Sequence, residues 1–593
     1  MIDRPNSFRD WSTSHQVEWE IDKTALVQAS RRRRKDPNNP RKTVPISRIP
    51  ITISGRVIPP SASHKFLGVI IDEQLRFKEQ LAAAAAKGTK YTAACHRFAK
   101  PSTGIRLSHM RQLFTSVVVP KMLYAADVWG AEMIARMGDK AGSRGLGKIL
   151  ERVLRMHALT TTGAMSTTST EVIVAHANIT PLPLLLQRIS FRSFVRMTTL
   201  PASNPIHKEI RQAARLRKRH RSPLHHLAAS FSIHPKVTEE IKAVRHSPKW
   251  TPPTKITVDE DKDDAIKRAR EATEEVQIFT DGSGINDNIG AAAILRRHGQ
   301  PDKILRFHLG SQTHHTVYNG EQVGMILGAE LFRREPNVRS VYMGVDNQAA
   351  ILATVSRNCH SGHALTDLFL QVLQSALDKH GLHFLSVRWV PGHANIAGNE
   401  SVDAEAKRAA EGETSRKDQL PQTLRRKDGP IPLPHNKSAL IQNHNALVKV
   451  KAKNTFASSQ RGRRMHQIDP SLPSAKFSTL VHFLPRRHAS AIMQLRTGHV
   501  PLNHHLTRIG KTPSPACPSC SEAAYETVHH LLFLCPTYEE LRHALRGKVG
   551  PRKINPEGVL ANPNNTRHLL KFVESTKRLA PTFGNLSPPE RRQ

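Results

Sequence analysis

The chain has 593 residues, with 88 lysines and arginines against 49 aspartates and glutamates, so its formal net charge is +39 at pH 7. Hydrophobic residues make up only 38% of the sequence and aromatic residues 5%, which argues against one large core and favours roughly three or four units joined by solvated segments. This charge surplus indicates nucleic acid as the partner, because each neutralised phosphate releases condensed counterions. No apolar run is long enough to anchor the chain in a bilayer, which excludes a membrane partner.

The first 205 residues mix short strand-like runs with apolar helices, including the segment 110–129. The N-terminus, MIDRPNSFRDW, lacks the apolar core of a secretory signal, so we expect a nuclear or cytoplasmic protein that is not secreted. The basic run RRRRK at 31–35 is either a nuclear import signal or a phosphate-binding loop. Residues 206–272 are rich in Lys, Arg, His and Pro, and we expect them to form a basic polar linker.

Residues 273–412 show the pattern of a compact unit of the α/β class, with a mixed sheet and helices packed on it. The helical spacing of Val323, Ile326, Leu327 and Leu331 predicts a helix over 318–332. The other predicted elements are strands at 276–280, 290–297, 303–310, 340–346 and 382–390, and helices at 347–355, 365–377 and 399–410.

Beyond this unit, three segments are expected to differ in character. We expect residues 413–499 to form a Pro- and Lys-rich connector with helices, and residues 500–545 to form a small zinc-binding module with clustered Cys and His. Residues 546–593 read as a disordered tail.

Four acidic residues of the compact unit stand at informative positions. Asp281 and Asp346 end apolar strands, Glu321 lies early in a helix, and Asp403 lies in the last helix. Each also has a simpler interpretation. Asp281 initiates a turn and Asp346 caps a helix. Glu321 is favoured by the helix dipole and Asp403 is a surface residue. However, a buried carboxylate costs free energy unless it is paired or holds a cation. Four together favour two Mg²⁺ ions about 4 Å apart, with Mn²⁺ as a substitute, as phosphodiester hydrolysis requires.

The segments IFTDGSG, YNGEQVGMILGAEL, VDNQAAI and WVPGHANIAGNESVDAEAKRAA resemble the successive motifs of the type 1 ribonuclease H family, in that family's order. The resemblance implies a ribonuclease H-like fold and assigns the family's catalytic, metal-binding acids to Asp281, Glu321, Asp346 and Asp403. It also assigns the family's mobile histidine, which assists proton transfer or product departure, to His393. The ten-residue separation between His393 and Asp403 is the family spacing.

The cysteines near the C-terminus predict a second kind of metal site. The two-residue gap between Cys517 and Cys520 lets both thiolates face one Zn²⁺, and Cys535 adds a third sulfur. Either His529 or His530 can complete a closed, structural site. His530 is favoured because the pattern CxxC…ETVxHLLxxCPxY resembles the C-terminal zinc-binding module of LINE-type (non-LTR) retrotransposon proteins.

The N-terminal region also resembles that class of protein. DWSTSHQVEWEIDKTALV and HKFLGVIIDEQLRFKEQL resemble the end of the palm and the start of the thumb of a non-LTR reverse transcriptase. No apolar strand carries an Ala-Asp-Asp sequence, and the pair Asp263-Asp264 lies in the polar linker. The resemblance therefore implies a truncated remnant in which Asp72 is a structural residue, and reverse transcriptase activity is not expected.

Together these features predict an endoribonuclease that cleaves the RNA strand of RNA–DNA hybrids by two-metal-ion hydrolysis. Its expected partners are the hybrid, RNA, DNA and a polymerase encoded by such an element. Two alternatives remain open at this point: a non-catalytic nucleic-acid-binding relic, and a fragment that assists reverse transcription with a partner polymerase.

Overall fold

A computed structural model describes residues 8–18, 20–53, 55–100, 104–136, 144–215, 221–427, 429–520 and 522–589. The chain divides into two compact units. One unit combines residues 1–187 with 449–593, and the other is the continuous segment 188–448. Within the described ranges, no helix combines the length and the apolar character needed to cross a bilayer.

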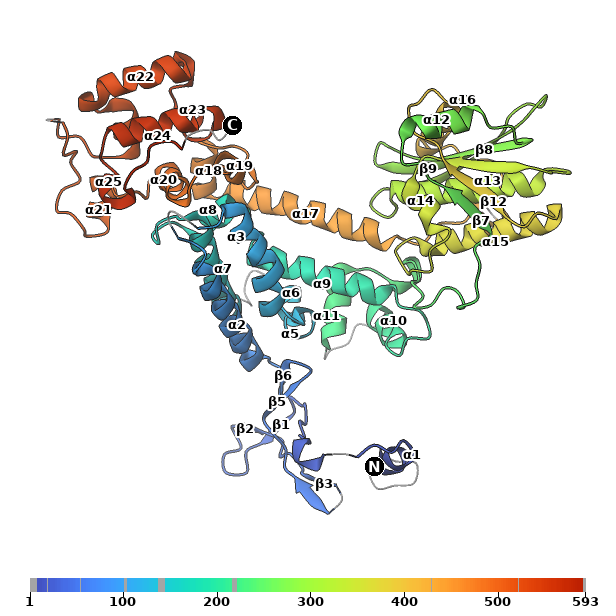
Figure 1. The fold of residues 1–593 in the computed structure, drawn as a ribbon. Coiled ribbons are helices and arrows are strands. Elements are labelled where there is room, and N and C mark those ends of the chain that lie inside the picture. Colours follow the sequence, from blue (N-terminus) through green and yellow to red (C-terminus); the bar gives the residue numbers. More distant parts are fainter. Residues whose placement is uncertain are drawn as a thin grey trace. The chain divides into compact units, whose positions relative to one another are not determined.

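The continuous unit has a mixed α/β fold built on a six-stranded sheet of order β10-β9-β8-β11-β12-β7 (Figure 1). The strands are β7 (Thr254–Thr257), β8 (Val276–Ile285), β9 (Asn288–Arg297), β10 (Lys303–Ser311), β11 (Val341–Val345) and β12 (Leu385–Trp389). The strands β8, β9 and β10 form an antiparallel meander. On the other side of β8, β11, β12 and β7 follow in parallel, so the sheet changes from antiparallel to parallel at β8.

Successive side chains of the strands point to opposite faces of the sheet and contribute to two cores, one on each face. In β8, Ile278 belongs to the core covered by α13 (Val317–Arg334) and α15 (His363–His380). The next residue, Phe279, belongs to a smaller core with residues of α16 (Ala397–Ala410) and α12 (Lys262–Arg270). Figure 1 shows these two pairs of helices on opposite faces of the sheet. The short helix α14 (Gln348–Ala353) follows β11.

The order of strands and helices predicted for 273–412 agrees with the structure, and the mixed α/β class is confirmed. The first strand is longer than predicted, because β8 continues through the sequence DGSG to Ile285. Its end is a two-residue hairpin turn, in which Asn286 and Asp287 have φ of 48° and 61°. Both values suit the turn type whose twist matches that of the flanking strands.

The expectation of a polar linker at 206–272 is wrong in this structure. The segment contains α10 (His207–Arg215), α11 (Pro223–Phe231), α12 and the sixth strand β7. The strand was missed because it has only four residues, two of them threonines. Pairing of β7 with β12, which is distant in sequence, decides its conformation.

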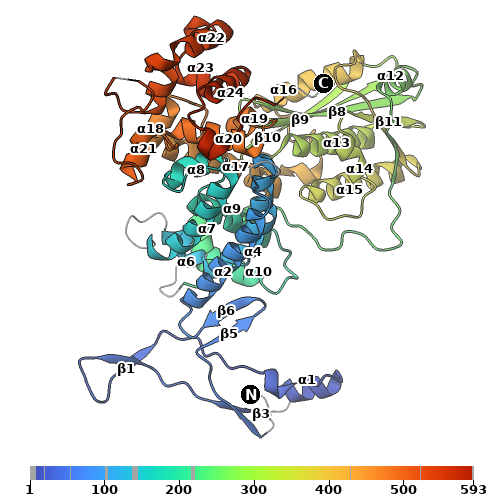
Figure 2. The same cartoon turned by 60° about the vertical axis from the view of Figure 1, so that its left-hand side comes forward.

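In the other unit, the N-terminal part begins with α1 (Phe8–Ser14) and three two-stranded hairpins. The hairpins are β1 (Arg33–Lys35) with β2 (Thr43–Pro45), β3 (Ile51–Ile53) with β4 (Arg56–Ile58), and β5 (Ser63–Phe66) with β6 (Val69–Asp72). Figure 2 shows β5 and β6 leading into α2 (Lys78–His96). The helices that follow are α3 (Leu107–Leu113), α4 (Val119–Met122), α5 (Ala126–Trp129), α6 (Ala131–Arg136), α7 (Arg144–Thr162) and α8 (Thr170–His176).

Two helices, α9 (Leu182–Thr198) and α17 (Lys437–Ser458), run across the sequence boundaries between the units. The segment 413–499, expected to be a connector with helices, contains α17, α18 (Gln460–His466), α19 (Lys476–Leu480) and α20 (Arg486–Thr497). The Cys/His module follows α21 (Asn503–Arg508).

The expectation of a disordered tail at 546–593 is also wrong for the residues that the structure describes there. That segment contains the end of α22 (Glu539–Val549), α23 (Pro556–Leu560), α24 (Thr566–Ser575) and α25 (Ala580–Phe583). The apolar side chains of α24 are buried, and Arg578 donates a 2.8 Å hydrogen bond to the buried carboxylate of Glu526. Apolar residues at helical spacing and this buried ion pair together fold the segment.

Close packing of α16 on β9 generates a stability prediction. A Cβ atom placed at Gly290 would lie 2.0 Å from the backbone nitrogen of Ala410. We therefore expect Gly290→Ala to destabilise this unit by about 1–3 kcal/mol, the usual cost of overpacking. Hydrogen-exchange mass spectrometry should show reduced protection in β8, β9 and α16.

The matched control is Gly547→Ala, because a Cβ atom at Gly547 meets nothing within 4 Å. This control should leave the protection of the sheet unchanged. Unchanged protection in Gly290→Ala would contradict the close approach of α16 to the sheet.

Candidate functional site

Three of the predicted acidic residues converge where the two central strands of the sheet, β8 and β11, lie side by side. Asp281 lies in β8, Asp346 directly follows β11, and Glu321 lies in the first turns of α13. The strands β8 and β11 are parallel neighbours in which Val345 pairs with Thr280, so Asp281 and Asp346 occupy adjacent positions. One carboxylate oxygen from each of the three residues lies within 4.8 Å of the others.

Glycines let α13 come close enough to β8 to complete this group. A Cβ atom at Gly282 would lie 2.2 Å from the backbone nitrogen of Glu321, and one at Gly320 would lie 3.0 Å from the Cα of Gly282. A capping box fixes the start of the helix, since Thr316 and Asn319 each accept a hydrogen bond from the other's backbone N–H. The Asp-Gly pair therefore positions a helix as well as supplying an acid.

Burial of the three carboxyl groups shifts their protonation. Burial, then the charges of Asp346 and Asp403, raise the pKa of Asp281 to about 7. Burial, then the charges of Asp346 and Asp281, raise the pKa of Glu321 well above its ordinary value. Burial is also the main cause that raises the pKa of Asp346. Glu321 Oε2 and Asp346 Oδ1 are buried without a hydrogen-bond partner among the described residues. Such oxygens suit a hard divalent cation.

The fourth predicted acid, Asp403, lies on α16 outside this group of three. Its charge still raises the pKa values of Asp281 and Asp346, so it is within electrostatic reach of both. In this structure its Oδ2 lies 2.6 Å from Nζ of Lys407, one helical turn away. Lys407 was missed from the sequence, although the i,i+4 spacing after Asp403 is the usual signal of such a pair.

The predicted histidine, His393, lies in the loop between β12 and α16 and is exposed. Its backbone has a φ of 53°. The loop passes beside the acidic group, because a Cβ atom at Gly392 would lie 3.5 Å from Asp346 Oδ2. A positive charge on His393 acts to lower the pKa of Asp346. The structure thus places His393 beside the acids on a loop.

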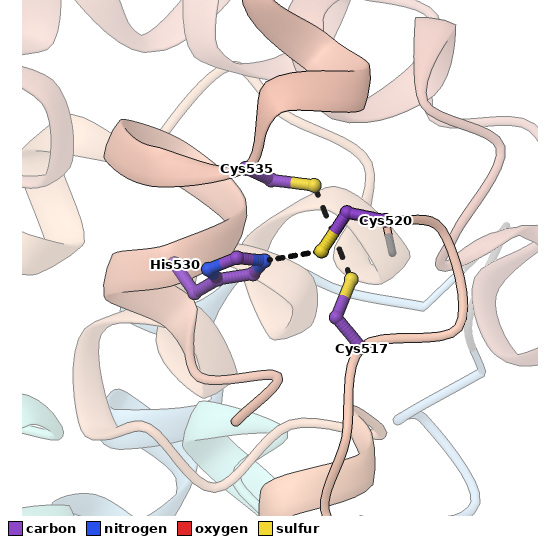
Figure 3. A group of neighbouring side chains, drawn as sticks. All are labelled: Cys517, Cys520, His530 and Cys535. Carbon is purple, nitrogen blue, oxygen red and sulfur yellow. Dashed lines mark hydrogen bonds between the residues drawn. The ribbon is translucent and has the colours of Figure 1, made fainter. Parts of the chain in front are cut away.

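The second candidate site joins three thiols and one imidazole (Figure 3). Sγ of Cys517 lies 3.9 Å from Sγ of Cys535, and Sγ of Cys520 lies 3.5 Å from Nε2 of His530. Tetrahedral zinc bonds require about 3.8 Å between two sulfur ligands and about 3.6 Å between sulfur and nitrogen. The four side chains therefore form a group that can hold a metal ion such as Zn²⁺.

Local backbone structure explains why His530 belongs to this group. His530 begins a π-helical turn, η5 (His530–Leu534), and Cys535 donates its backbone N–H to the carbonyl of His530 at 2.8 Å. The ring of His529 packs instead against Phe533. Burial and the neighbouring thiols raise the pKa of Cys520 to about 11, so a cation is needed to keep several thiolates together.

A scan against protein-family models finds no match for this chain, and neither does a search of the curated proteins.

The raised pKa values predict that a Mg²⁺ ion would compete with protons for the acidic group. Below pH 7, Asp281 is increasingly protonated, and a cation must displace that proton. Isothermal titration calorimetry should show the dissociation constant for Mg²⁺ rising by up to about tenfold per pH unit for each displaced proton between pH 8 and pH 6. Asp281→Asn should remove the binding, and equal affinity at both pH values would contradict the assignment.

The same shift acts on stability in the metal-free protein. A carboxyl group with a raised pKa binds more protons in the folded state, so the folded state loses stability as pH rises from about 4 to 7. The protection of β8 against hydrogen exchange should therefore be greater at pH 5 than at pH 8, after correction for the intrinsic exchange rate. Asp281→Asn should reduce this difference. A rise in protection from pH 5 to pH 8 would contradict the raised pKa of Asp281.

Metal analysis tests the group of three thiols and one imidazole. The full chain should contain about one zinc ion, and Cys520→Ser should lower this content and reduce protection in 515–538. Cys359→Ser is the control, since Cys359 is a free thiol outside the group. A folded protein that keeps its module without any bound metal would refute the site.

Proposed function

We propose that this chain is an endoribonuclease that cleaves the RNA strand of RNA–DNA hybrids, with a type 1 ribonuclease H-like domain over 273–412. The observation that carries the proposal is the convergence of Asp281, Glu321 and Asp346 within 4.8 Å, in a buried setting. The order of the resembling motifs along the chain supports the same assignment.

The acidic group fits two Mg²⁺ ions because it combines clustered carboxylates with buried oxygens that lack partners among the described residues. Ions bound there would supply an activated water and stabilise the leaving oxygen of an in-line displacement. Asp281, Glu321 and Asp346 would hold them. Asp403 would become a further ligand if its carboxylate released Lys407 and bound a metal ion instead. The loop position of His393 suits it to carry a proton to or from the scissile phosphate.

The substrate assignment rests on charge and on the resemblance. The net charge of +39 supplies affinity for phosphates without selecting a sequence. Selection of the RNA strand requires recognition of the 2′-hydroxyl. Asn347 lies next to Asp346, but its Oδ1 accepts a hydrogen bond from the backbone of Ala350 and caps α14. The Asn347 side chain is therefore used in capping this helix.

We further propose that the chain derives from a LINE-type retrotransposon protein. The Cys/His module supports this origin, because its pattern of ligands resembles the zinc-binding module of such proteins. Asp72 accepts the backbone N–H groups of Arg76 and Phe77 and so closes a turn. Asp263 and Asp264 lie exposed in the first turn of α12. Neither position resembles a polymerase metal ligand.

Cleavage of a labelled hybrid tests the proposed activity. Purified full-length protein with Mg²⁺ should cut the RNA strand and leave 3′-hydroxyl and 5′-phosphate ends. Asp346→Asn should slow cleavage by at least about 10²-fold, because charge stabilisation by metal ions is worth several kcal/mol. Asp378→Asn, an exposed acid on α15, is the matched control.

Two outcomes would contradict the proposal: no cleavage by the wild-type chain, or cleavage that Asp346→Asn leaves unchanged. Hybrid binding without cleavage would instead support the alternative of a non-catalytic nucleic-acid-binding protein. Primer extension with and without an element-encoded polymerase tests the alternative of an assisting fragment.

A further inference from the structure

The basic run near the N-terminus forms part of a hairpin that the proposed nuclease site does not use. We define the basic ribbon as residues 31–45, which comprise β1, β2 and the connection between them. Seven of these residues are lysine or arginine and only Asp36 is acidic. The strand labelled β1 in Figure 2 belongs to this ribbon.

Two arginines fix the base of the basic ribbon to the turn after β6. Arg31 donates from Nε to the carbonyl of Gln74 at 2.7 Å. Arg48 donates to the carbonyl of Ser30 at 2.9 Å and pairs with the carboxylate of Glu73 at 3.2 Å. The contacts of Arg48 are partly buried and the contact of Arg31 is exposed. These contacts anchor the base of the ribbon without using the cations nearer its tip.

The cations nearer the tip remain available for an external anion. Among the described residues, none of these side chains forms an ion pair with a carboxylate, and all are exposed. They are Arg32, Arg33, Arg34, Lys35, Arg41 and Lys42. Asp36 forms no ion pair with them among the described residues, and its carboxylate accepts the N–H of Asn38 at 2.9 Å.

The strand register distributes the positive charge over both faces of the ribbon. Successive side chains of a strand point to opposite faces, so Arg33 and Lys35 lie on one face and Arg34 on the other. Arg33 donates to the hydroxyl of Thr43 on its own face, and Arg34 donates to Ser47. A ribbon that is positive on one face suits a flat anionic surface, whereas one that is positive on both suits a groove between two anionic walls.

Dimensions decide which groove fits. A strand layer with its side chains is about 10 Å thick. The major groove of B-form DNA is about 12 Å wide and admits a two-stranded ribbon, whereas the minor groove is about 6 Å wide. The major groove of A-form RNA is deep and too narrow for side chains to enter.

We propose that the basic ribbon inserts into the major groove of duplex DNA, with each face turned towards one phosphate strand. The site is separate from the acidic group, and DNA binding through it does not depend on the proposed ribonuclease activity. The chain would thereby hold duplex DNA through one unit, whatever nucleic acid the other unit acts on.

A ribbon variant removes four charges while keeping both anchoring arginines: Arg32→Gln, Arg34→Gln, Lys35→Gln and Lys42→Gln. A control variant removes four exposed charges elsewhere, so that the net charge of the two proteins is equal: Lys262→Gln, Lys267→Gln, Lys511→Gln and Lys571→Gln. Circular dichroism should show the same helix content in both variants and the wild type.

Fluorescence anisotropy with a labelled DNA duplex, without added magnesium, measures the salt dependence of binding. Four lost phosphate contacts should reduce the slope of log affinity against log salt by about 3.6. Between 50 and 200 mM salt, wild-type affinity should therefore fall about 10²-fold more than that of the ribbon variant. The control variant should keep the wild-type slope.

Two further duplexes test the groove itself. DNA whose cytosines carry a glucosyl group at position 5 has the same phosphates but a filled major groove, so wild-type binding should fall to the level of the ribbon variant. On duplex RNA the ribbon and control variants should bind alike. The proposal is overturned if the two variants bind DNA alike, if filling the groove has no effect, or if duplex RNA shows the same selective loss.

Discussion

The crowding of negative charge between β8, β11 and α13 is the constraint on which the continuous unit depends. Asp281, Glu321 and Asp346 are held near one another in a setting that favours their protonated forms. Nothing local makes this arrangement favourable, so the remainder of the fold must stabilise it. The close approach of Gly282 and Gly320 and the two cores of the sheet do this. A divalent cation would turn the same repulsion into binding energy.

The two candidate metal sites differ in the chemistry that they permit. The group of Cys517, Cys520, His530 and Cys535 has soft ligands and supplies all four positions of a tetrahedral ion, which suits a structural role. The carboxylate group offers hard oxygens, which suit a cation such as Mg²⁺ that keeps some of its waters. The ion pair of Glu526 and Arg578 connects the Cys/His group to the C-terminal helices, so a metal bound there would stabilise that region.

Cations in this chain serve two purposes that composition alone does not separate. Some are internal ties: Arg496 is buried and donates to Asp469 at 2.6 Å and to the carbonyl of Leu560 at 2.8 Å. Others, such as Lys35 and Lys42 in the basic ribbon, have no carboxylate partner among the described residues and can act on an external polyanion. The net charge therefore overestimates the number of cations that can bind an external polyanion. The hydrogen bonds and ion pairs of each side chain show which cations are available.

The sequence by itself determined the elements whose pattern reflects a local cause. Alternation and helical spacing in 273–412 predicted the strands and helices, because a face must be apolar to be buried. The positions of the acids and the two-residue gap of the cysteines indicated metal binding, because ligands at these spacings can face one ion. Only the tertiary structure decided β7 and the packing of the helices after 546. These features depend on contacts between distant segments or on side-chain direction, which local sequence patterns do not specify.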